Sequence, residues 1–251
     1  MAQRVDDLKS AFALSSLFGI AAACSVPLLS STLPVEARSL PLPIAAFCVV
    51  LAMLLAGVYG LVAFVEIRLA RYSGLEPTPV LVSLKGGPCG LTRMRPGIAV
   101  TVGLGCGALL VAAVWIIRQF FPATLPATLH PPGLAAAFVA SAAGSLGEEI
   151  VFRLFLLSLL LSFSPKGDLA TVLALALSAL AFGVAHAPAF VFLFGGWSAV
   201  PALSWVWLVF LNGVCGAAFG IVLLRQGIGA AVLAHFATDA VWHAASQLLS
   251  A

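Results

Sequence analysis

Charge is scarce in this sequence of 251 residues. Asp, Glu, Lys and Arg make up 8% of the chain, hydrophobic residues make up 62%, and the mean hydropathy is +1.15. Because a soluble domain carries about 25% charged residues, this composition excludes an ordinary water-soluble protein. The net charge of +3 is small, and the basic residues do not interleave with aromatics along a groove. The chain therefore belongs in a lipid bilayer and has no nucleic-acid partner.

The apolar segments also lack the alternation of polar and apolar residues that a membrane β-barrel needs. They are continuous and rich in Leu, Ala and Val, so we expect helices. The five cysteines form no CxxC pair, and all but Cys89 lie inside apolar runs, where they can pack as small hydrophobic residues. We therefore expect neither a disulfide nor a thiolate-bound metal.

Seven apolar runs approach or exceed the roughly 20 residues that a helical membrane span needs. They lie at 11–33, 44–65, 97–121, 134–163, 169–194, 201–224 and 228–248. The first run is too long for the apolar core of a signal peptide, so we expect an uncleaved helix. The fold class is thus all-α, a polytopic transmembrane helical bundle of about seven spans. The count becomes eight if 134–163 or 187–200 is broken, because Pro188, Gly195 and Gly196 allow a kink.

The connection at 66–96 is basic, with five Lys or Arg residues against two Glu. By the positive-inside rule it lies in the cytoplasm, which with seven spans also puts the N-terminus there. We expect a multi-pass protein of the inner or plasma membrane. We divide the chain into an N-terminal three-span region, 1–133, and a C-terminal catalytic core, 134–251, that together form one membrane unit.

Charged residues return inside the predicted span at 134–163. Each ionised group near the bilayer centre costs roughly 2.5–3.5 kcal/mol on insertion scales, so Glu148, Glu149 and Arg153 need a reason to be there. Glu149 and Arg153 are four residues apart and share a helix face, so they can form an ion pair. Glu148 projects about 100° away and has no such partner. We predict that Glu148 is the catalytic group and that Glu149 and Arg153 support it.

Two further spans contribute histidines, His186 on 169–194 and His235 on 228–248. Asp239 lies four residues after His235, so it can fix the tautomer of that imidazole. A carboxylate and two histidines from three helices can bind and polarise a water molecule, with or without a metal. For His130 and His243 we favour ordinary hydrogen-bonded packing.

The residues Glu148-Glu149-x-x-x-Arg153, Phe182-x-x-x-His186 and His235-x-x-x-Asp239, in this order, resemble the three motifs of the CPBP family. That family includes type II CAAX prenyl endopeptidases and bacteriocin-processing and immunity proteins. The resemblance covers roughly residues 134–248. It implies a glutamate-dependent, or alternatively metal-dependent, intramembrane endopeptidase acting on a prenylated tail, a leader peptide or a C-terminal sorting tag.

The resemblance also implies a role for each matching position. Glu148 would activate water, His186 would help to hold it, and His235 and Asp239 would stabilise the oxyanion. The family's last motif commonly ends in Asn, whereas this chain has Asp239. An ionised Asp239 cannot donate a hydrogen bond, so it must be protonated, orient His235 or help to bind a metal.

The sequence requires no cofactor, but a divalent metal such as zinc, held by Glu148, His186 and His235, is an alternative. Two other function classes stay open: a proton- or metal-coupled transporter that uses the same cluster, and a non-catalytic immunity protein. The expected partners are a peptide or protein substrate and the bilayer, and the sequence does not indicate an oligomeric state. With the spans as drawn, His186 lies roughly 25 Å from the cytoplasmic end and His235 roughly 10 Å, so one boundary conflicts with a shared site.

Overall fold

The computed structural model describes residues 2–29, 44–72, 94–125, 133–165 and 167–250, and every regular element within them is a helix. The long helices are α1 (Ala2–Leu29), α2 (Ile44–Tyr72), α4 (Pro96–Phe120), α5 (Leu134–Glu149), α7 (Asp168–Ala185), α9 (Ala202–Gln226) and α10 (Ile228–Ser250). The all-α prediction is therefore confirmed for the described residues. The basic connection at 66–96 falls largely on residues that are not described, as does His130.

The predicted span 134–163 is one continuous helical segment made of three parts. After α5 comes a π-helical stretch, η4 (Ile150–Leu157), followed by α6 (Ser158–Phe163). In this stretch Phe152 O accepts a hydrogen bond of 2.6 Å from Ser178 Oγ on α7. Such π-helical turns are rare and occur frequently at functional sites. Here the stretch begins directly after Glu149.

The sequence allowed a break near Pro188, and the structure has one at His186. Helix α7 ends at Ala185, His186 forms a turn, and α8 (Ala187–Phe194) begins on its other side. Pro188 has no backbone N–H, so it cannot continue the hydrogen bonding of α7 across the break. Helix α8 then ends at Gly195, whose φ of +80° lies in the left-handed region that glycine adopts without strain.

Among the described residues, three helical segments are long and apolar enough to cross a membrane: Pro96–Phe120, Asp168–Phe194 and Ala202–Gln226. Shorter apolar helices lie at Ala11–Ser25 and Cys48–Val62. The segment 134–163 contains three charged residues, and α10 contains two histidines and an aspartate, which lowers its hydropathy. The described helices therefore support a membrane protein, whereas the number of spans stays a prediction.

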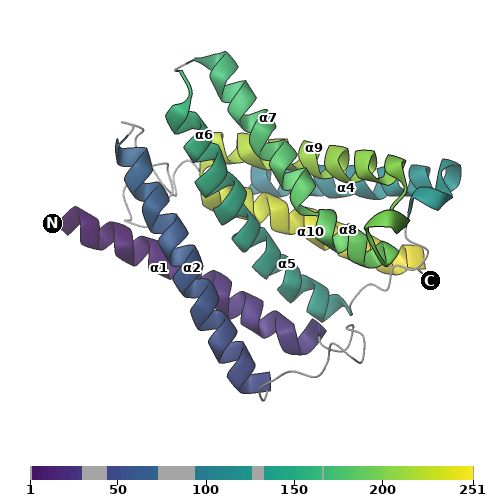
Figure 1. Cartoon of the computed structure of the whole chain (residues 1–251), viewed down its shortest axis with the longest axis horizontal. Coiled ribbons are helices and arrows are strands. Elements are labelled where there is room, and N and C mark those ends of the chain that lie inside the picture. The colour runs from purple at the N-terminus through teal and green to yellow at the C-terminus, as the bar shows by residue number, and fades with distance from the viewer. Residues whose placement is uncertain (1, 30–43, 73–93, 126–132, 166, 251) are drawn as a thin grey trace.

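The helices pack in two groups that meet along α5 (Figure 1). Helix α10 lies between α4 and α9, and α7 lies against α9. Helices α1 and α2 pair with each other, and α1 packs against α5. Helices α4 and α10 approach closely at Gly107. A Cβ at this position would lie 2.9 Å from Thr238 O, so only glycine fits there.

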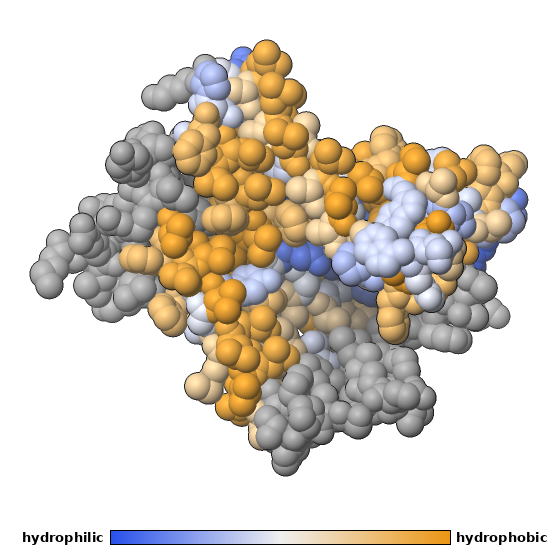
Figure 2. Space-filling view, viewed as in Figure 1, coloured by the Kyte–Doolittle hydropathy of each residue, from blue (hydrophilic) through white to orange (hydrophobic). Residues whose placement is uncertain are grey.

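Apolar side chains dominate the outer surface of these helices. Figure 2 shows orange, hydrophobic residues over much of the coloured surface, with a blue, hydrophilic area in a hollow near its centre. Exposed large apolar side chains include Met53 on α2, Leu104 on α4, Leu169 on α7 and Phe210 on α9. A surface of this kind suits contact with lipid, while the polar groups gather inside.

Candidate active site

The predicted ion pair on α5 and η4 is present and fully buried. Arg153 Nε lies 3.4 Å from Glu149 Oε2, and their side chains are 1% and 0% exposed. The four-residue spacing brings the two groups onto one face, as the sequence indicated. Both charges are buried away from the membrane. Each is the other's partner, which offsets part of the desolvation cost of burying them.

Aromatic rings enclose the Arg153 guanidinium. Its Cζ lies 4.1 Å from the centre of the Phe182 ring and 5.5 Å from that of Phe219. Arg153 Nη2 donates a hydrogen bond of 3.1 Å to Gly216 O on α9. The cation is thus stabilised by ring faces and a carbonyl as well as by Glu149. Phe182, which is 1% exposed, has the packing role typical of a buried aromatic residue and also contacts the polar groups.

Glu149 has a second partner that the sequence did not indicate. Its Oε1 lies 2.9 Å from Nδ1 of His235 on α10, 86 residues later in the chain. The Nδ1–H group donates this bond because the carboxylate can only accept. The expectation that Asp239 fixes the His235 tautomer is therefore wrong, since Asp239 Oδ1 lies 3.7 Å from Nε2, the other ring nitrogen. The spacing along α10 correctly predicted that Asp239 lies near the His235 ring. It could not predict the contact with Glu149, which lies on another helix.

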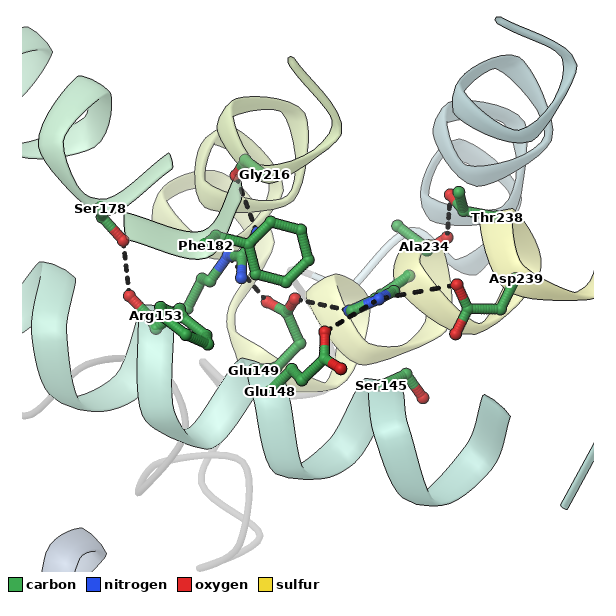
Figure 3. Close-up of polar contacts among 12 residues, drawn as sticks. Ser145, Glu148, Glu149, Arg153, Ser178, Phe182, Gly216, Ala234, Thr238 and Asp239 are labelled. Carbon is green, nitrogen blue, oxygen red and sulfur yellow. Dashed lines mark hydrogen bonds and ion pairs between the residues drawn. The ribbon is translucent and has the colours of Figure 1, made fainter. Parts of the chain in front are cut away.

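Glu148 lies between the two imidazoles. Its Oε2 is 3.8 Å from His186 Nε2 and 3.7 Å from His235 Nε2. Figure 3 shows Glu148 and Glu149 projecting side by side from α5, with Asp239 opposite them on α10. The His186 and Glu148 side chains are 29% and 37% exposed, whereas His235 is 5% exposed. The structure therefore brings Glu148, His186, His235 and Asp239 together, and the conflict of depths disappears.

The helix break is what orients His186. Its Nδ1 lies 2.8 Å from Phe182 O in the last turn of α7, and a carbonyl can only accept, so Nδ1 carries the proton. The neutral ring then presents an unprotonated Nε2 toward Glu148. The His186 and Phe182 rings also pack in a T-shaped arrangement, with their centres 4.8 Å apart. His186 and His235 thus point the same type of nitrogen at one carboxylate oxygen.

Distances of 3.7–3.8 Å are too long for direct hydrogen bonds and suit groups that share one water molecule. No protein group among the described residues hydrogen-bonds Glu148 Oε2, although that atom is buried. Buried polar atoms are normally satisfied, so an unpartnered carboxylate oxygen beside two ring nitrogens indicates a position for a polar ligand. His243 is farther along α10 and is not among the groups that contact Glu148.

Glu148, His186 and His235 are also side chains of the types that bind a divalent metal. Both Nδ1 atoms are held by oxygen acceptors, which leaves both Nε2 lone pairs free, as in histidines that bind metals. Glu148, His186 and His235 would hold a divalent ion, which would polarise a bound water or carbonyl. No cluster of three or more such side chains in the described part of the chain has the arrangement of a metal site. These three side chains therefore have the donor atoms of a metal site, but they are not spaced as metal ligands.

The match to known families lies in the C-terminal half. Residues 130–241 match the family model described as type II CAAX prenyl endopeptidase Rce1-like, and this confirms the CPBP resemblance of that region. The matched part contains all four clustered residues and excludes α1, α2 and α4. Comparisons with curated proteins and with solved structures found no match. The match supports an intramembrane endopeptidase in general.

Proposed function

Because residues 130–241 match the type II CAAX prenyl endopeptidase Rce1-like family, we propose that this chain hydrolyses a peptide bond with a water molecule activated by Glu148. The observation that carries this proposal is the position of Glu148 Oε2, 3.8 Å and 3.7 Å from two imidazole Nε2 atoms. A general base must lie within reach of the proton it takes, directly or through one water.

In the proposed reaction, water binds between Glu148 and His186. One O–H donates to Glu148 Oε2 and the other to His186 Nε2, which accepts because its proton is on Nδ1. Glu148 takes the first proton as the water oxygen attacks the scissile carbonyl. The C–N bond of the resulting tetrahedral intermediate then breaks, and the proton passes from Glu148 to the leaving amine.

His235 and Asp239 would stabilise the oxyanion of that intermediate. With Nδ1–H bonded to Glu149, His235 can donate from Nε2 only as the imidazolium. Glu149 and Asp239 are carboxylates within ion-pairing distance of that cation. Asp239, if protonated, supplies a second donor. Glu149 thus supports catalysis by holding the ring of His235, and Arg153 by holding Glu149.

The substrate class follows from the family and the setting of the site. We propose a membrane-associated peptide: a prenylated tail, a leader peptide or a C-terminal sorting tag. We also propose that all seven predicted ranges cross the bilayer, with the N-terminus in the cytoplasm. Reporter fusions after residues 36 and 126 should then report the side opposite the cytoplasm, and cytoplasmic signals at both would contradict this topology.

The decisive test is Glu148→Gln, which keeps the size of the side chain and removes the base. Purified protein in proteoliposomes would be given quenched peptides of the three substrate classes, and membranes from cells with either form would be compared for new protein termini. We expect cleavage to fall by about 10²–10⁴-fold. His243→Gln is the control, because His243 lies on α10 one helical turn after Asp239 but does not contact Glu148. This variant should keep its activity.

Retained cleavage by Glu148→Gln would remove Glu148 from the mechanism. Proton-dependent uptake of a solute by wild-type proteoliposomes, with no cleavage of any peptide, would instead favour the transporter.

A further inference from the structure

Two glycines of α4 bring this helix close to α10. Gly103 and Gly107 are four residues apart, so they share one face of the helix, and both are buried. A Cβ at Gly103 would lie 2.7 Å from the Ala237 Cβ, and a Cβ at Gly107 would lie 2.6 Å from the Val241 Cβ. Small residues at this spacing allow the backbones of membrane helices to approach closely. Helix α4, which lies outside the matched region, thus packs directly on a helix of the candidate site.

A hydrogen bond crosses this contact. Thr238 Oγ1 on α10 lies 3.0 Å from Gly103 O on α4, and Thr238 is 2% exposed. The same hydroxyl lies 3.0 Å from Ala234 O, one turn earlier in α10 (Figure 3). Because a hydroxyl has a single proton, that proton is shared between a carbonyl of its own helix and a carbonyl of the neighbouring helix. The bond to Gly103 is the one that joins two helices.

This bond can fix the rotation of α10 in a way that the surrounding contact cannot. Gly103 and Gly107 have no side chains to interlock with α10, and packing of small apolar groups depends little on direction. A hydrogen bond is directional, because its donor–H–acceptor angle is preferably above about 150°. The Thr238 hydroxyl therefore resists a turn of α10 about its own axis.

Such a turn would move two groups of the candidate site. His235 lies three residues before Thr238 and Asp239 lies one residue after it, so both are within about 100° of the hydroxyl around the helix axis. An atom roughly 5–6 Å from the axis moves about 1 Å when the helix turns by about 10°. His235 Nε2 lies 3.7 Å from Glu148 Oε2, so a shift of this size is large for a contact through one water. Misplacement by about 1 Å can lower a rate about 10²-fold.

Asp239 depends most on the backbone that carries it. His235 is also held from α5, since its Nδ1 lies 2.9 Å from Glu149 Oε1. Within the described residues, no protein group hydrogen-bonds the Asp239 carboxylate, and its ion-pair partner, His235 Nε2, lies 3.7 Å away. The direction of the Asp239 side chain therefore follows from the rotation of α10.

We propose that Thr238 is a positioning residue. Its bond to Gly103 O sets the rotation of α10 about its axis. That rotation directs His235 and Asp239 toward the position of the oxyanion. This inference rests on the proposed function of those two groups. It also makes α4 a part of the catalytic unit, although α4 lies outside the matched region.

The test is Thr238→Val, which replaces the hydroxyl with a methyl group of similar size. We expect kcat for the quenched peptide in proteoliposomes to fall about tenfold with KM unchanged, because groups that stabilise the oxyanion act in the transition state. Gly103 O keeps its place in the hydrogen-bond ladder of α4, so the thermal midpoint should fall by no more than about 2–4 °C. Thr238→Ser keeps the hydroxyl and should restore kcat to within about twofold of wild type.

Thr101→Val is the matched control for loss of a hydroxyl. Thr101 is exposed, and its Oγ1 donates to Gly97 O of its own helix at 2.8 Å, so this variant should leave kcat unchanged. Gly107→Ala tests the contact from the side of α4, because its methyl group must displace α10. It should lower both kcat and the thermal midpoint. Gly105→Ala, whose Cβ would meet nothing within 4 Å, should lower neither.

A wild-type kcat in Thr238→Val, in a protein that Glu148→Gln still inactivates, would overturn this inference and leave the proposed function intact. Equal losses in Thr238→Ser and Thr238→Val would also overturn it, because the hydroxyl would then not be the cause. A rise in KM at constant kcat would contradict a positioning role, since it would place Thr238 in substrate binding. Activity retained by Glu148→Gln would overturn the function itself, and the role of Thr238 with it.

Discussion

The α1–α2 pair and the α5–α10 core differ in what joins their helices. In the core, side chains contact one another across helices through charge, as between Glu149 on α5 and His235 on α10. The α1–α2 pair uses aromatic packing instead: Phe18 of α1 packs on the Tyr59 ring of α2 and on the backbone of Gly147 of α5. The core thus concentrates the chemistry, while the N-terminal helices shape the space around it. Substitutions in the two regions should therefore fail in different ways.

The largest expected effect is from Arg153→Met, which removes the charge at the centre of the core. Glu149 would stay buried with only His235 as partner, and breaking a buried pair in this way costs about 3–5 kcal/mol. We expect a large fall in the yield of folded protein in detergent and a lower thermal midpoint. Arg225→Met, at an exposed position on α9, is the control and should change little. Equal stability of the two variants would contradict the view that charge joins the core helices.

Glu149→Gln should have the next largest effect. The amide keeps the shape but loses the charge that holds Nδ1–H of His235 and the Arg153 guanidinium. We expect kcat to fall about 10–100-fold, as is typical when the partner that orients a functional histidine is changed. Cleavage rates in proteoliposomes, together with thermal midpoints, would separate this effect from unfolding. A rate equal to wild type would show that His235 needs no fixed orientation.

The smallest expected effect is on stability, from alanine substitutions at two glycines of α5. They test how the N-terminal helices pack on the core. Gly147→Ala must displace Phe18, at a cost of about 1–3 kcal/mol. A Cβ at Gly144 would meet only Glu148 Oε1, at 3.9 Å, so Gly144→Ala should gain up to about 1 kcal/mol in helix propensity. Thermal midpoints of the two variants should therefore move in opposite directions. If both rise, α1 does not pack on Gly147 as described.

The sequence was sufficient to place the helices but not their contacts. The predicted ranges 44–65, 97–121 and 134–163 each fall on helix in the structure, since long apolar runs identify helices well. The Glu149–Arg153 pair also followed from spacing along one helix. The bond from Glu149 to His235 and the contact of Phe18 with Gly147 did not, because helices that are apolar on every face give no sign of which face meets which neighbour. The π-helical stretch, Ile150–Leu157, is likewise not marked by any glycine or proline in the sequence.

The separation of 86 residues between Glu149 and His235 has a consequence for synthesis. At about 5–20 residues per second, the ribosome releases Glu149 roughly 4–17 s before its histidine partner exists. Arg153 follows within one helical turn and can neutralise Glu149 from the start. Arg153 would therefore act as the counter-ion of Glu149 while the nascent helix is still in or beside the translocon. Glu148 has no such early partner, so its insertion depends on the helices that arrive last.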